Sequence, residues 1–193
     1  MNYDRSLLQQ IAAPHPMRKN ILNLMVLYRL HDDCYTEMLD YTIDLFESQG
    51  LGADYYGYHN INHELEVTYV SLLAAEQSKV QFSDEDMKYL FIAALFHDFD
   101  PEKSADKPHE ENVIKFITTD KKLLELINTT NIDLEILKVL ILRTTYPWSG
   151  ELRKNAEEQI KQCFQNSALT RNNQQYQHHI MEMGQYLSVV DRI

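Results

Sequence analysis

The chain has 193 residues, enough for one domain that buries about two-thirds of the surface of its unfolded chain. Its five glycines and five prolines are scattered between segments rich in Leu, Ile, Met, Glu and Lys, so we expect a single all-α domain over residues 1–193. The net charge is −11, and no cluster of Lys and Arg is available for phosphate contacts, which argues against a nucleic-acid partner.

Cysteine usage and hydropathy bear on the compartment. Cys34 and Cys163 lie in unrelated segments without paired spacing, which is typical of a reducing compartment. The first residues lack a basic leader with an apolar core, and no apolar run approaches the roughly 20 residues of a membrane span. We therefore expect a cytoplasmic protein that does not cross a membrane.

Apolar periodicity predicts a succession of helices joined by short polar segments. They are expected over residues 17–30, 35–49, 63–77, 83–97, 109–117, 123–127, 132–142, 151–164 and 175–193. Ser83 followed by Asp86 resembles a capping box, Asp120 is a candidate N-cap, and Gly50 and Gly52 are expected to end the second helix.

The central helix ends in an unusual way. The apolar run 90–96 leads directly into His97 and Asp98, which should therefore lie at the inner end of a buried helix. A buried carboxylate is costly unless it is paired, hydrogen-bonded or bound to a cation, and imidazole and carboxylate are common metal ligands. His31-Asp32 follows Arg29 and lacks such a run, so we interpret that second pair as a polar helix end.

Two further positions could complete a metal site. His59 and His63 are four residues apart and would project from one helical face, and Asp191 follows the mostly apolar run 186–190. His63, His97, Asp98 and Asp191 would then hold one or two divalent ions, either zinc, magnesium, manganese or iron, with Asp98 able to bridge to a second ion. Considered one by one, His63 could instead be a helix-start residue satisfied by backbone, and Asp191 an exposed acid near a chain end.

This pattern resembles the HD-domain metal-dependent phosphohydrolase superfamily, and the resemblance extends from about Tyr58 to Asp191. Residues 58–63 are similar to the Tyr-His-Asn-x-x-His signature of cyclic-nucleotide phosphodiesterases. Residues 96–100 are similar to the His-Asp-x-Asp segment of the same enzymes. The resemblance implies an all-α HD domain, with N-terminal helices over about residues 1–50 and a metal-binding core over residues 54–193.

The resemblance also implies a function. His63, His97, Asp98 and Asp191 would hold the first metal, with Asp98 touching a second, and His59 would act as the general acid that protonates the leaving oxygen. A water activated by the metal would attack phosphorus in a small nucleotide-type phosphodiester. The alternatives are a nucleotide phosphomonoesterase and a sensor domain of the same fold that binds metal or ligand without turnover.

The chain departs from the phosphodiesterases after the His-Asp-x-Asp segment. Asp100 is followed by Pro101 rather than by a histidine, and the next histidine is His109. His109 is either a second-metal ligand or water-holder, or a helix-start residue. Asp100 could orient a metal ligand without binding the metal itself. The segment that selects the purine in those enzymes is absent, so either the base pocket is built differently or the sequence is a truncated piece.

Other side chains are weaker candidates for contacts with the substrate. Tyr146 and Trp148 could stack on a planar ligand or simply pack, and Lys103 and Arg143 could reach phosphate oxygens. The adjacent pair at 178–179 is expected to be solvated.

Overall fold

The computed structural model describes residues 16–49, 59–102 and 109–193, and these residues form nine α-helices and one short 3-10 helix without any strand. The all-α prediction is therefore confirmed for this part of the chain. The predicted stop at Gly50 and Gly52 and the predicted role of Lys103 fall outside it. The elements are α2 (Pro16–Leu27), α3 (Asp33–Ser48), α4 (Ile61–Ala74), η1 (Ala75–Gln77), α5 (Asp84–Phe96), α6 (Glu110–Thr119), α7 (Lys121–Thr130), α8 (Leu134–Leu142), α9 (Gly150–Asn166) and α10 (Gln174–Val190).

Polar side chains set the starts of the central helices. The capping box at α5 is confirmed, because Ser83 Oγ accepts from the Asp86 backbone N–H at 3.1 Å and the Ser83 N–H donates to Asp86 Oδ2 at 2.8 Å. The Asp120 cap is confirmed as well, since its Oδ1 accepts from the Leu123 N–H at 2.8 Å. Both caps satisfy N–H groups that the first helical turn leaves without a backbone partner.

Helix α4 begins earlier than predicted. Its N-cap is Asn60, whose side-chain oxygen accepts from the N–H groups of Asn62 at 2.9 Å and His63 at 3.4 Å. The helix therefore starts at Ile61 rather than near His63. As a consequence, the His63 side chain leaves the first turn of a capped helix, where its direction is well defined.

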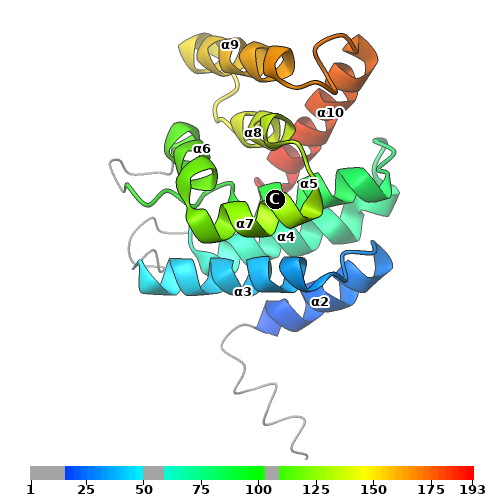
Figure 1. Cartoon of the computed structure of the whole chain (residues 1–193), viewed down its shortest axis with the longest axis vertical. Coiled ribbons are helices and arrows are strands. Elements are labelled where there is room, and N and C mark those ends of the chain that lie inside the picture. Colours follow the sequence, from blue (N-terminus) through cyan, green and yellow to red (C-terminus); the bar gives the residue numbers. More distant parts are fainter. Residues whose placement is uncertain (1–15, 50–58, 103–108) are drawn as a thin grey trace, which may run out of the picture.

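Helix α5 is the buried centre of the fold. Every residue from Tyr89 to Phe96 is at most 1% exposed, as expected for a helix that is apolar on all sides. It packs against α3, α4, α8 and α10. Figure 1 shows α2 and α3 at one end of the molecule and α9 with the start of α10 at the other, while α4, α5 and α8 lie between them.

A contact between α5 and α10 corrects one expectation. His178 is exposed, as predicted, but the ring of His179 lies against α5, with Nε2 3.0 Å from Asp86 Oδ2. The prediction of a solvated pair is therefore wrong for His179, because the carboxylate of the α5 capping box is available to its ring.

None of the described helices is long and apolar enough to cross a lipid bilayer.

Candidate metal centre

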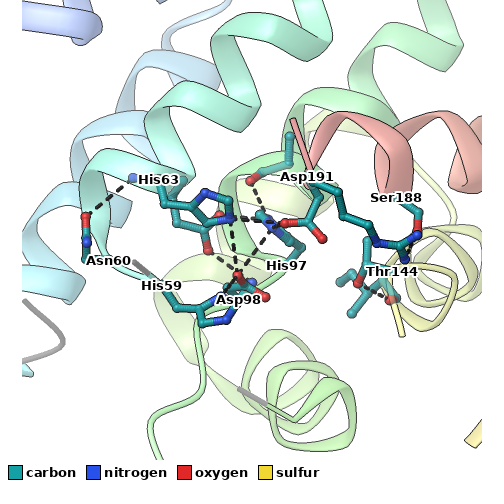
Figure 2. A network of polar contacts seen from close by, with 12 residues as sticks. His59, Asn60, His63, His97, Asp98, Thr144, Ser188 and Asp191 are labelled. Atoms are coloured by element: carbon teal, nitrogen blue, oxygen red, sulfur yellow. Dashed lines mark hydrogen bonds and ion pairs between the residues drawn. The ribbon is translucent and has the colours of Figure 1, made fainter. Parts of the chain in front are cut away.

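Four side chains from different parts of the sequence meet where α4 begins and where α5 and α10 end. His63 lies in the first turn of α4, His97 and Asp98 directly follow α5, and Asp191 directly follows α10. One nitrogen or oxygen from each of the four lies within 4.8 Å of the others (Figure 2). The structure thus brings together the four residues predicted as ligands, and this group could hold a metal ion.

The donor atoms of the group are mutually oriented. Asp191 Oδ1 lies 3.0 Å from His63 Nε2 and 3.2 Å from His97 Nε2. Asp98 Oδ2 lies 3.5 Å from each of the same two nitrogens. The side chains are nearly or fully buried, with exposed fractions of 0–14%. Two imidazole nitrogens and two carboxylate oxygens form a donor set that suits zinc, manganese and iron.

Electrostatics supports the same interpretation. Burial lowers the pKa of His63, but hydrogen bonds to Asp191 and Asp98 outweigh it and raise that pKa to about 9. Burial raises the pKa of Asp191, yet hydrogen bonds from His63 and His97 bring it down to about 2. For His97, burial is likewise outweighed by nearby carboxylates, and its pKa lies well above the usual value. Protons thus balance the acids here, and a divalent cation binding to the same atoms would displace those protons.

Glu64 is a member of this site that sequence reasoning missed. Its side chain is fully buried, and its Oε1 accepts from the backbone N–H of Asp98 at 3.0 Å. Its Oε2 lies 2.7 Å from His97 Nδ1, although the N–H of that ring atom is better aligned with Ala94 O at 3.0 Å. Glu64 therefore contacts both residues of the His-Asp pair and helps to orient them.

A signal for Glu64 was present in the sequence. Ile61, Val67 and Thr68 lie three or four residues from it and are all buried, so Glu64 occupies the buried stripe of α4. A carboxyl on such a stripe needs a partner, as the argument applied to Asp98 already required.

His59 lies beside Asp98. Its Nδ1 is 2.6 Å from Asp98 Oδ2, and its side chain is 17% exposed. Because a carboxylate only accepts hydrogen bonds, Nδ1 is the donor in this contact. The other ring nitrogen, Nε2, is therefore the atom that can exchange a proton with a ligand.

Asp100 and His109 contribute to a loop rather than to the ligand group. The carboxylate of Asp100 is buried and accepts from the backbone N–H of Glu102 at 2.9 Å and of His109 at 3.0 Å, and from Asn112 Nδ2 at 3.1 Å. His109 is the exposed N-cap of α6. Within the described residues, neither belongs to the group that could hold a metal. Asp100 instead joins the segment after Asp98 to the start of α6.

A cavity of about 730 Å³ lies against this centre. Three of the four candidate ligands and His59 line it, together with Asn60, Asn62, Glu66, Glu110, Thr144, Tyr146, Arg192 and Ile193. Its volume is in the range of small-molecule sites. Tyr146 lines this cavity, whereas the ring of Trp148 packs 4.0 Å from the Arg143 guanidinium and is not among the lining residues.

Comparisons with known proteins found no matching family model, no similar curated protein and no similar solved structure. The function is therefore inferred from the geometry of the site.

Proposed function

We propose that this protein is a metal-dependent phosphohydrolase of the HD-domain superfamily that hydrolyses a nucleotide-type phosphodiester. The observation that carries the proposal is the meeting of His63, His97, Asp98 and Asp191 beside a cavity of about 730 Å³ into which His59 also faces. Isolated acids and histidines are common in proteins. A buried group of four with a further histidine bonded to one of its members is much more specific.

The four residues would hold a divalent ion by two nitrogens and two carboxylate oxygens. Such a donor set favours zinc, manganese or iron over magnesium, which prefers oxygen ligands alone. When bound, the ion would supply Lewis acidity at the phosphoryl group and would lower the pKa of a nearby water. The part of the chain that the structure describes contains one such group, which supports one ion rather than two.

The protein's own side chains would carry the proton transfer. Asp98 holds the Nδ1 side of the His59 ring at 2.6 Å, which orients the ring. The Nε2 side can then deliver a proton to the alcohol oxygen that leaves phosphorus. A general acid is of most use when the leaving group is a poor one, as the ribose hydroxyl of a nucleotide is.

The test is a substrate panel on the metal-loaded protein. The panel consists of bis(4-nitrophenyl) phosphate, cyclic mononucleotides, cyclic and linear dinucleotides, and nucleoside monophosphates. We expect hydrolysis of diesters. We also expect His59→Gln to keep its metal while losing roughly 10²- to 10⁴-fold in rate on nucleotide diesters, the usual contribution of a general acid. His178→Gln is the matched control, because that ring is exposed on α10.

Each alternative has its own outcome. Turnover of monophosphates alone would identify a phosphomonoesterase, and full metal loading without turnover of any ester would identify a sensor domain. Unchanged diester hydrolysis in His59→Gln would remove the general acid from the mechanism.

A further inference from the structure

Two arginines near the cavity, Arg143 and Arg192, contact aromatic rings. The Arg143 guanidinium stacks 4.0 Å from the ring of Trp148, and the residue is 9% exposed. The Arg192 guanidinium lies 4.6 Å from the ring of Tyr146, and its Nη2 donates to Ser188 Oγ at 2.6 Å. Within the described residues, neither guanidinium forms an ion pair with a carboxylate.

Such an arrangement is unexpected in a chain with 29 acidic and 18 basic residues. Arg18, Arg29 and Arg153 each reach a carboxylate at 2.5–2.9 Å. By contrast, Arg143 is buried, and burial together with the charges of Arg192 and Arg153 lowers its pKa. Glu157 opposes this effect only in part. Holding two guanidinium groups near each other is unfavourable, and a bound anion would relieve it.

The position of Arg192 indicates where that anion would lie. Arg192 directly follows Asp191, and both line the cavity together with Thr144 and Tyr146. Of the described residues that line the cavity, Arg192 is the only Lys or Arg, whereas Glu66 and Glu110 are further acids. An anion that entered the cavity would therefore meet favourable charge at the metal centre and at Arg192.

Resting on the proposed function, we propose that Arg192, backed by Arg143, binds a second phosphate group of the substrate that is not cleaved. The preferred substrate is then a phosphodiester of a nucleotide that carries an additional phosphomonoester. One guanidinium can offer two parallel N–H donors to phosphate oxygens, and the hydrogen bond to Ser188 engages only Nη2 of Arg192. Without this ligand, the two arginines would only hold the loop around Tyr146 by stacking on its aromatic rings.

Direct binding tests this assignment without relying on turnover. Calorimetry of the metal-loaded full chain would compare adenosine 3′,5′-bisphosphate with adenosine 5′-monophosphate. We expect the wild type to bind the bisphosphate about 10- to 100-fold more tightly, the range of a charge-assisted hydrogen-bonded contact. Arg192→Gln should abolish this preference and Arg192→Lys should keep part of it. Arg29→Gln changes an exposed arginine that pairs with Asp84 and should leave the preference unchanged.

Kinetics gives a second measurement. The substrates would be a diadenosine dinucleotide with and without a 5′-phosphate, and bis(4-nitrophenyl) phosphate, which has no second phosphate. Arg192→Gln should raise KM for the 5′-phosphorylated dinucleotide by a clearly larger factor than for the other two substrates. Equal losses on all three substrates would overturn the assignment.

The two proposals fail separately. A wild-type protein that binds the bisphosphate and the monophosphate equally well overturns the second-phosphate site, whatever its activity. A protein that prefers the bisphosphate but cleaves no diester retains the second-phosphate site and contradicts the proposed hydrolysis.

Discussion

Replacing Glu64 with glutamine tests whether the buried carboxyl group organises the metal centre. Its Oε1 accepts from the Asp98 N–H at 3.0 Å, and its Oε2 lies 2.7 Å from His97 Nδ1, which is hydrogen-bonded to Ala94 O. A glutamine side chain of the same shape has one oxygen and one NH2 group. If the NH2 group takes the place of Oε1, the Asp98 N–H loses its acceptor, and if it takes the place of Oε2, the attraction between the carboxyl group and the His97 ring is lost.

The cost follows from that mismatch. A buried donor left without its acceptor costs about 1–3 kcal/mol, and Glu64 is fully buried. We expect Glu64→Gln to lower the free energy of unfolding of the metal-free protein by this amount. Loss of a group that orients metal ligands typically weakens metal affinity by about 10- to 100-fold, and we expect a loss in that range here.

Urea denaturation of chelator-treated protein and calorimetric titration with Mn²⁺ or Zn²⁺ measure the two effects. Glu37→Gln is the matched control, since it removes the same charge from an exposed position on α3. If Glu64→Gln and Glu37→Gln have the same stability and the same metal affinity, the reasoning about the buried carboxyl group is refuted.

Two further predictions concern the same region. In chelator-treated protein, hydrogen bonds to acids raise the pKa of His63 to about 9, so its contribution to stability is complete below about pH 6.5 and is lost as the pH rises through 9. The shift corresponds to roughly 3 kcal/mol, and denaturation curves that do not change between pH 6.5 and 9.5 would contradict it. A Cβ at Gly184 would lie 2.7 Å from Arg143 Cβ. Gly184→Ala should therefore force α10 away from α8 and lower the free energy of unfolding by about 1–3 kcal/mol. An unchanged melting temperature would contradict this prediction.

Much of the helical framework could be predicted from local signals. The Ser83 and Asp120 caps act within four residues of their own helices, so their partners are visible in the sequence. The predicted start of α4 was wrong by two residues, because the N-cap is Asn60 and the helix begins at Ile61. The four candidate ligands were recognisable because each pairs a polar side chain with a segment that is expected to be buried.

The contacts of the site depend on tertiary structure and could not be predicted. Glu64 is 33 positions before His97, and only the packing of α4 on α5 brings them together. Asp100 was expected near the metal, but backbone N–H groups of its own loop satisfy its carboxylate. The aromatic contacts of Arg143 and Arg192 could not be inferred either, since nothing in the sequence indicates which arginines contact a ring.

The central claim is that His63, His97, Asp98 and Asp191 bind one divalent cation. Equilibrium dialysis against Mn²⁺, Fe²⁺ and Zn²⁺, followed by elemental analysis, tests it most directly. We predict about one ion per chain in the wild type, and loss of that ion in His63→Ala and Asp98→Ala, whose folding is verified by circular dichroism. A folded wild type that retains none of the three metals, or an Asp98→Ala variant that retains the ion at unchanged affinity, would contradict it.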